Sequence, residues 1–221
     1  TLTPRDHVDQ TRKLFDVGLD AAPAQLLAYA SGDSVDALVD DVLIAHAADA
    51  VGAARAVMDL AVDYAKVRRQ FDQPIGSFQA VQGLCVDMYE TVELARSGVI
   101  HALWAADSAD ADERHRAALR ARAFAGRLAT VGDIAIQVFG GIGFTFEHDA
   151  HMYLRRAVAL SLMVATMTGG GEVSAARLAR RVGTGQRRVP EIDFGGMDTE
   201  FREATRTTMS AIAKLPADEH R

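Results

Sequence analysis

The chain has 221 residues, a formal net charge of −6 at pH 7 and 49% hydrophobic residues. The acidic balance gives no reason to expect nucleic acid or an anionic membrane as a partner, because both attract positively charged surfaces. No apolar run approaches the roughly 20 residues that span a bilayer, and the first residues show no charged-then-apolar targeting pattern, so we expect a cytoplasmic protein without a membrane span.

The first residues predict one or two β-strands. Apolar and polar residues partly alternate between Thr11 and Asp20, as on a strand with one covered face. An isolated hairpin is marginal in water. We therefore expect these strands to pair with a segment absent from this sequence or to lie on a helical body.

From about Val35 the spacing of apolar residues changes to steps of three and four, which predicts an amphipathic helix of about 30 residues. Its inward positions are Leu43, Ala47, Ala50, Ala54, Val57, Ala61 and Tyr64. Pro74 and Gly76 interrupt the chain, and Ser77 can cap a second helix that runs to about Ala106. The inward positions of this second helix are Val81, Leu84, Cys85, Met88, Val92, Ala95, Val99 and Leu103.

Further helices are predicted downstream. The polar stretch 107–112 is a loop that can cap a third helix, which we expect from about Glu113 to Phe139. A fourth helix is expected from Asp149 to about Met163, and two more in the ranges 172–182 and 198–215. Because short loops between long helices imply antiparallel neighbours, the predicted fold is all-α, an antiparallel helical bundle with a short N-terminal β remnant.

Two motifs carry the chemistry. Gly140 and Gly141 follow a helix, and two adjacent glycines let a turn expose backbone N–H groups, which suits a diphosphate. Arg68 supplies a planar, permanently charged group that can reach the same phosphates. Each feature also has a structural explanation, since glycines end many helices and an arginine at a helix end interacts with the helix dipole.

Residues 64–79 and 137–144 resemble, in order and spacing, two signature stretches in the C-terminal helical domain of acyl-CoA dehydrogenases. In that family these stretches hold FAD across a dimer interface. The resemblance assigns six residues to the flavin: Arg68, Phe71, Gln79, Gln137, Gly140 and Gly141. It also implies three parts of the chain: the end of a middle β-domain in 1–25, the helical bundle in 35–183, and a linker with the start of a second module or a tail helix in 184–221.

The positions that carry the catalytic base in this family are apolar here. Family enzymes remove the α-proton of an acyl-CoA with a glutamate, and the resemblance places that position at Val164, or at Val42 in a minority of members. Leu43 occupies a position that often carries an arginine for the CoA portion. Glu172 could act as the base if its loop is rearranged. The usual catalytic base is therefore expected to be missing.

A retained flavin grip without a base resembles the branch that degrades sterol side chains, in which two unlike halves share one active site. The resemblance implies an FAD-dependent acyl-CoA dehydrogenase that introduces an α,β double bond into a bulky, steroid side-chain acyl-CoA. Its partners would be the acyl-CoA, an electron-transfer acceptor and another acyl-CoA dehydrogenase subunit or half, possible as a homo- or hetero-oligomer or as a fused double protein.

Two alternatives remain open. The chain could be a non-catalytic oligomerisation scaffold that keeps the helical bundle, or a self-sufficient dehydrogenase that uses Glu172. Glu147, His148 and His151 could also suggest a metal site, but two histidines and a carboxylate without further ligands are more often polar packing groups, so we expect no metal.

Overall fold

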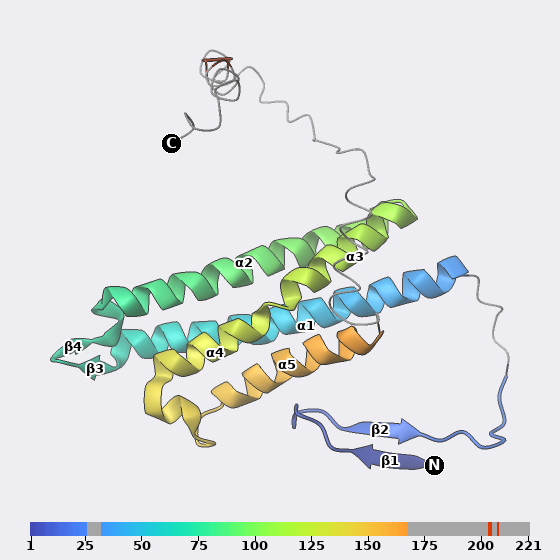
Figure 1. The fold of residues 1–221 in the computed structure, drawn as a ribbon, viewed down its shortest axis with the longest axis horizontal. Helices are drawn as coiled ribbons and strands as arrows, with labels where there is room; N and C mark the ends of the chain where they lie inside the picture. Colours follow the sequence, from blue (N-terminus) through green and yellow to red (C-terminus); the bar gives the residue numbers. More distant parts are fainter. Residues whose placement is uncertain (26–31, 168–202, 205–206, 208–221) are drawn as a thin grey trace, which may run out of the picture. The chain divides into compact units, whose positions relative to one another are not determined.

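The computed structural model describes residues 1–25, 32–167, 203–204 and 207 (Figure 1). The chain divides into two compact units, Thr1–Thr184 and Gly185–Arg221, and nearly all described residues belong to the first. The helices predicted in the ranges 172–182 and 198–215 lie outside the described residues, apart from three helical positions in the second range. None of the helices described is long and apolar enough to cross a membrane.

The N-terminal residues form a two-stranded hairpin, where one or two strands were predicted. Strand β1 (Leu2–Arg5) pairs antiparallel with β2 (Leu14–Val17) in the register Leu2↔Val17 to Arg5↔Leu14. Within the described part of the chain, the two strands pair only with each other. Side chains of the connection between them contact the helices, which supplies the support that an isolated hairpin lacks.

Helix α1 (Gly32–Val67) is the long amphipathic helix predicted from the three- and four-residue spacing. Six of the seven predicted inward residues are buried and Tyr64 is half-buried. Four of the buried six are alanines, which let neighbouring helices approach closely. The helix therefore contacts every other helix of the bundle.

Helix α2 (Gln79–Ser108) follows a short 3-10 turn (Ile75–Ser77). Ser77 does not cap it, because its hydroxyl donates to the carbonyl of Pro74 at 2.7 Å and the N-cap position falls on Phe78. Leu103 is 50% exposed, contrary to prediction. The buried stripe steps by three from Val99 to Ala102, which leaves Leu103 on the outer side.

The predicted third helix is two helices, α3 (Ala111–Ala125) and α4 (Leu128–Phe139). Glycine has a low helix propensity, and at Gly126 and Arg127 the helical ladder is interrupted by a tight turn in which the Arg127 amide donates to the Phe124 carbonyl at 3.1 Å. Asp110 caps α3 as expected, accepting from the Glu113 amide at 2.8 Å. Helix α5 (Ala150–Met167) starts one residue after, and ends four residues after, the predicted bounds.

The helices pack as an antiparallel bundle with a mostly aliphatic core, which confirms the predicted fold class (Figure 1). α1 and α2 run in opposite directions, α3 and α4 return, and α5 reverses again. The C-terminal ends of α1 and α4 consequently lie at the same end of the bundle. The ring contact between Tyr64 and Phe139, with centroids 5.3 Å apart, joins these two ends directly.

Candidate functional site

The two sequence motifs meet at this end of the bundle. Tyr64 belongs to the first motif and lies four residues before Arg68, while Phe139 directly precedes Gly140 in the second. Their edge-to-face ring contact fixes the last turn of α1 against the last residue of α4. Motifs that are about 70 residues apart in sequence therefore form one surface region.

Arg68 follows the last residue of α1 and is exposed. Its backbone is anchored, because its amide donates to the Tyr64 carbonyl at 2.8 Å and its carbonyl accepts from the Ile75 amide at 2.7 Å. Its guanidinium forms no hydrogen bond or ion pair with any residue that the structure describes. A fixed backbone with an uncommitted cation suits the binding of an external anion.

A tight hairpin carries Phe71. Strands β3 (Arg69–Gln70) and β4 (Gln73–Pro74) are joined by two residues with positive φ, Phe71 at 53° and Asp72 at 63°. This is the pattern of a type I′ turn, which normally takes glycine or asparagine. Phe71 is 86% exposed and touches Phe78 edge to face at 6.0 Å. The strained turn therefore presents an aromatic ring to whatever lies outside the chain.

Two glutamines lie beside this region. Gln79 is the first residue of α2, and Gln137 is in the last turn of α4. Both are exposed, and neither side chain forms a hydrogen bond with a described residue. Their amide groups can donate to or accept from an external ligand.

The glycines of the second motif have three different roles. Gly140 has φ 66° and ψ −140°, a conformation that L side chains rarely adopt, and its N–H donates to the Gln137 carbonyl. That amide is therefore not bare, contrary to expectation. A Cβ on Gly143 would lie 2.7 Å from the Ile136 carbonyl oxygen, so packing requires glycine there. A Cβ on Gly141 would meet nothing within 4 Å, so the chain's own packing gives no reason for glycine at that position.

Of the two positions where the family carries its catalytic base, the structure describes the side chain at Val42 and not the one at Val164. Val42 is half-buried, and its carbonyl accepts a hydrogen bond from His46 Nδ1 at 2.7 Å. Leu43 is 1% exposed and belongs to the core, so its side chain cannot contact a ligand. The side chain of Val164 and the whole of Glu172 lie outside the described residues.

The histidines after the glycine turn have aromatic partners. The ring of His148 lies on Phe139 with centroids 4.0 Å apart, and its Nδ1 accepts from the Ala150 amide at 3.1 Å. His151 contacts Phe146 instead, at 4.8 Å. The described residues hold no group of three or more side chains arranged to bind a metal.

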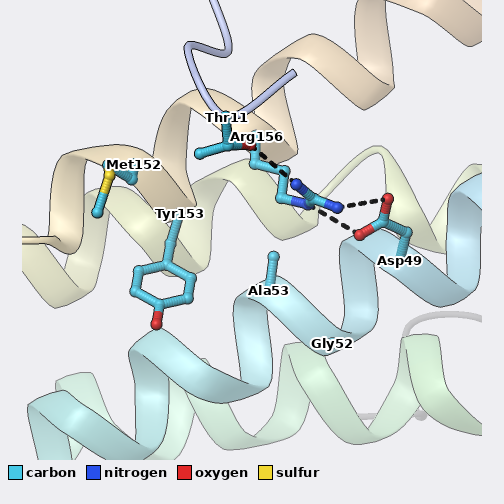
Figure 2. Close-up of a pocket in the computed structure, with 7 residues that line it drawn as sticks. All are labelled: Thr11, Asp49, Gly52, Ala53, Met152, Tyr153 and Arg156. Atoms are coloured by element: carbon cyan, nitrogen blue, oxygen red, sulfur yellow. Dashed lines mark hydrogen bonds and ion pairs between the residues drawn. The ribbon is translucent and has the colours of Figure 1, made fainter. Parts of the chain in front are cut away.

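A pocket that was not predicted lies between α1, α5 and the N-terminal connection (Figure 2). Its volume is about 410 Å³, and its lining consists of Thr11, Asp49, Gly52, Ala53, Met152, Tyr153 and Arg156. The helical spacing of these residues gives a partial signal, because Asp49, Gly52 and Ala53 on α1 are three and four residues apart, as are Arg156 and its neighbours Tyr153 and Met152 on α5, so each set shares a helix face. Their proximity is a tertiary feature that no local pattern contains.

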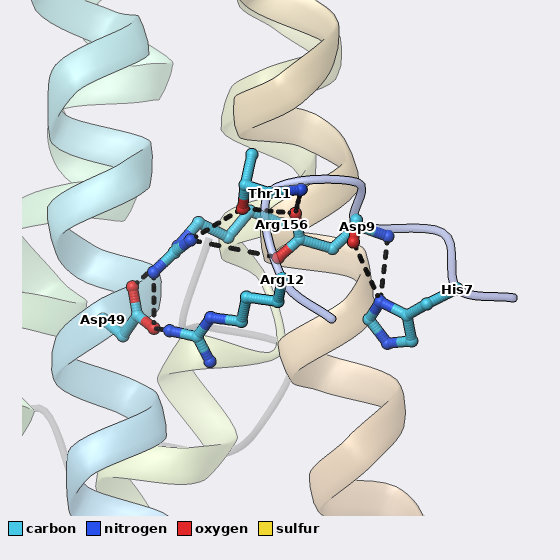
Figure 3. Close-up of polar contacts among 6 residues, drawn as sticks. All are labelled: His7, Asp9, Thr11, Arg12, Asp49 and Arg156. Atoms are coloured by element: carbon cyan, nitrogen blue, oxygen red, sulfur yellow. Dashed lines mark hydrogen bonds and ion pairs between the residues drawn. The ribbon is translucent and has the colours of Figure 1, made fainter. Parts of the chain in front are cut away.

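An ion network (Figure 3) includes three of the residues that line this pocket, Thr11, Asp49 and Arg156. The Arg156 guanidinium binds both oxygens of Asp49, at 2.9 and 3.1 Å, and donates to the Thr11 hydroxyl at 2.9 Å. Arg12 forms a second ion pair with Asp49. The network ties the connection between β1 and β2 to both α1 and α5.

Asp9 completes the network from a buried position. Burial alone would raise the pKa of its carboxyl, but hydrogen bonds from the Thr11 hydroxyl and amide, together with the charges of Arg156 and Arg12, outweigh burial and lower the pKa. The hydrogen bond and charge of Asp49 likewise raise the pKa of Arg156. Both groups are therefore held in their charged forms.

Residues 43–183 match the family model described as the acyl-CoA dehydrogenase C-terminal domain. The chain is 38% identical over 217 residues to acyl-CoA dehydrogenase FadE34 of Mycobacterium tuberculosis, covering 97% of this chain and 29% of that protein. It is 40% identical over 158 residues to acyl-CoA dehydrogenase IpdE2 of Mycolicibacterium smegmatis, covering 71% of this chain and 46% of that protein.

Among solved structures, the chain is similar to a variant of the Tcur3481-Tcur3483 steroid ACAD. The TM-score is 0.71 at 27% sequence identity, covering 83% of this chain and 48% of that chain. The chain thus spans less than half the length of each of these proteins.

Proposed function

The chain belongs to the acyl-CoA dehydrogenase family, and from this premise we propose that it clamps FAD in an enzyme that introduces an α,β double bond into a bulky acyl-CoA. The observation that carries the proposal is the region formed by the two motifs. It combines an anchored but uncommitted guanidinium at Arg68, two exposed amides at Gln79 and Gln137, and an unobstructed backbone at Gly141.

These residues fit the chemistry of FAD. Its diphosphate is anionic and suits the guanidinium of Arg68, and its flat rings suit an exposed aromatic side chain such as Phe71. FAD, when bound, would accept the hydride removed from the β-carbon of the acyl group. The open surface at Gly141 would let a bulky cofactor approach the backbone closely.

We further propose that this part of the enzyme lacks the catalytic base. A valine cannot accept a proton, and Val42 occupies one of the two positions where the family carries the base. Val164 occupies the other, by its spacing from Gly140 in the second motif. The α-proton would then be removed by a group on another half of the assembly.

The substrate and the partners are proposed from similar proteins. The solved structure Tcur3481-Tcur3483 is called a steroid ACAD, and its name combines two protein designations, Tcur3481 and Tcur3483. This supports a steroid side-chain acyl-CoA as the substrate and a second, unlike acyl-CoA dehydrogenase half as the partner. In this proposal residues 1–25 are the end of a β-domain, residues 35–183 form the helical bundle, and residues 184–221 lead to a further module or a tail helix. A separate electron-transfer acceptor would reoxidise the flavin.

Substituting Arg68→Ala in the full-length assembly tests the proposal. Hydrogen bonds to charged groups contribute about 1.5–3 kcal/mol, so we expect FAD affinity to fall by roughly 10- to 150-fold, measured by flavin fluorescence on titration of the apoprotein. Arg127→Ala is the control, since Arg127 is also exposed but lies at the opposite end of α4. Equal flavin content and turnover in the Arg68 variant and the wild type would support the scaffold alternative instead.

A further inference from the structure

The pocket between α1 and α5 is separate from the FAD-clamping region. Ala53 and Arg68 are 15 residues apart, which corresponds to about 22 Å along α1 at 1.5 Å per residue. Its volume of about 410 Å³ lies within the range of small-molecule sites, roughly 300–1,000 Å³. The pocket is therefore a separate site from the proposed FAD clamp, and ligand binding in it does not depend on the proposed function.

Gly52 forms part of the pocket wall in the middle of α1. A Cβ at this position would meet nothing within 4 Å, so the chain's own packing does not require glycine there. The missing side chain leaves the α1 backbone open beside the pocket, where a ligand can approach it closely.

The charges at the edge of the pocket are already matched. Arg156 is bound to both oxygens of Asp49 and to Thr11, and the Thr11 hydroxyl also donates to Asp9 at 2.6 Å. Among the lining side chains, Tyr153 alone carries a polar group that forms no hydrogen bond with a described residue. Met152 and Ala53 add apolar surface, and the methionine can adapt to the shape of a ligand.

We propose that this pocket binds an uncharged, mainly apolar ring or aliphatic group bearing one hydroxyl or carbonyl oxygen, which pairs with the Tyr153 hydroxyl. A neutral ligand fits because a charged one would find no free counter-charge and would have to compete with the Asp49–Arg156 pair. The apolar body would lie against Gly52, Ala53 and Met152, where it is removed from water.

Methyl NMR of the 221-residue chain tests the proposal. Of its seven methionines, Met152 lines the pocket, and its ¹³C-methyl signal can be assigned with Met152→Leu. The probes are 4-tert-butylcyclohexanol and the matched anion 4-tert-butylcyclohexanecarboxylate. We expect the alcohol to shift the Met152 signal saturably, with at least tenfold weaker binding of the carboxylate. No shift of Met152 with the alcohol, or equal binding of both probes, would overturn the proposal.

Matched variants locate the binding. Gly52→Leu would fill the pocket and reduce the affinity for the alcohol at least tenfold. Gly83→Leu is the control, because Gly83 lies in the interior of α2 with equally open space and does not line the pocket. Tyr153→Phe would weaken binding by about 2- to 12-fold, the equivalent of one hydrogen bond. An unchanged affinity in Gly52→Leu, with melting curves that show both leucine variants folded, would refute the assignment.

Discussion

Replacing Asp49 by asparagine should loosen the connection between β1 and β2 from the bundle. Asp49 is the acceptor for two arginines, Arg156 from α5 and Arg12 from the N-terminal connection. Asparagine keeps the volume but removes the charge, so the two guanidinium groups would face each other without their shared carboxylate. We expect a lower melting temperature and faster amide exchange at Thr11.

The size of the effect follows from the burial of the pair. Breaking a buried ion pair costs about 3–5 kcal/mol and an exposed one about 0.2–1 kcal/mol. The side chains of Asp49 and Arg156 are 24% and 27% exposed, which lies between these limits and nearer the buried one. We therefore expect a loss of roughly 2–3 kcal/mol. For a domain of this size, that corresponds to a melting temperature lower by about 4–12 °C.

The assay is thermal unfolding of wild type, Asp49→Asn, Arg156→Leu and the double variant. Residues in direct contact should couple by about 0.5–3 kcal/mol in such a cycle. Asp59→Asn is the matched control, because Asp59 lies on the same helix and pairs with Arg55 at an exposed position, where no measurable change is expected. If Asp49→Asn has the same melting temperature as Asp59→Asn, the network does not stabilise the fold in this way. The same conclusion follows if the free-energy losses of Asp49→Asn and Arg156→Leu add up to that of the double variant.

Two further predictions concern backbone conformation and pH. Gly140→Ala should destabilise the chain by about 1–3 kcal/mol, because the positive φ at Gly140 is strained for alanine, whereas Gly141→Ala should leave the melting temperature unchanged; equal losses would contradict the distinction. Burial raises the pKa of the Asp40 carboxyl above its ordinary value, although the hydrogen bond with His115 opposes this. The stability that Asp40 contributes is thus fully present below its ordinary pKa and is lost as the pH rises through its raised pKa in the folded chain. The midpoint of urea unfolding should therefore fall over this pH range in the wild type and should not show this fall in Asp40→Asn.

The course of α1 could be predicted from the sequence because its pattern is repeated along the whole element. Six of the predicted inward residues are buried, since a long amphipathic helix averages out local irregularities. The prediction was wrong where one residue decides the outcome. Gly126 interrupts the third helix within a pattern that otherwise continues, and Leu103 lies one position away from the buried stripe.

The candidate site could be predicted only in part, for a different reason. The motifs around Arg68 and Gly140 are local, so their residues could be named from the sequence. The partners of Asp49 could not, because Arg156 lies 107 positions away and nothing local to either residue indicates the pairing. The pocket depends on the same long-range packing of α5 on α1, so it also required the structure.

The direction of the helices decides which residue must carry the charge in the proposed FAD clamp. Arg68 follows the C-terminal end of α1, and Gly140 terminates α4, so both residues lie at helix ends that carry partial negative charge, whereas Gln79 opens α2 at an N-terminal end of the opposite sign. C-terminal ends repel a diphosphate, unlike the N-terminal ends that commonly bind phosphate. The Gly140 amide is also already bonded to Gln137. In the proposed clamp, the guanidinium of Arg68 would offset the two C-terminal dipoles, while Gly141 would contribute space. Consequently Arg68→Ala should lower FAD affinity more than Gly141→Ala does, and the reverse order would show that backbone access, not charge, holds the cofactor.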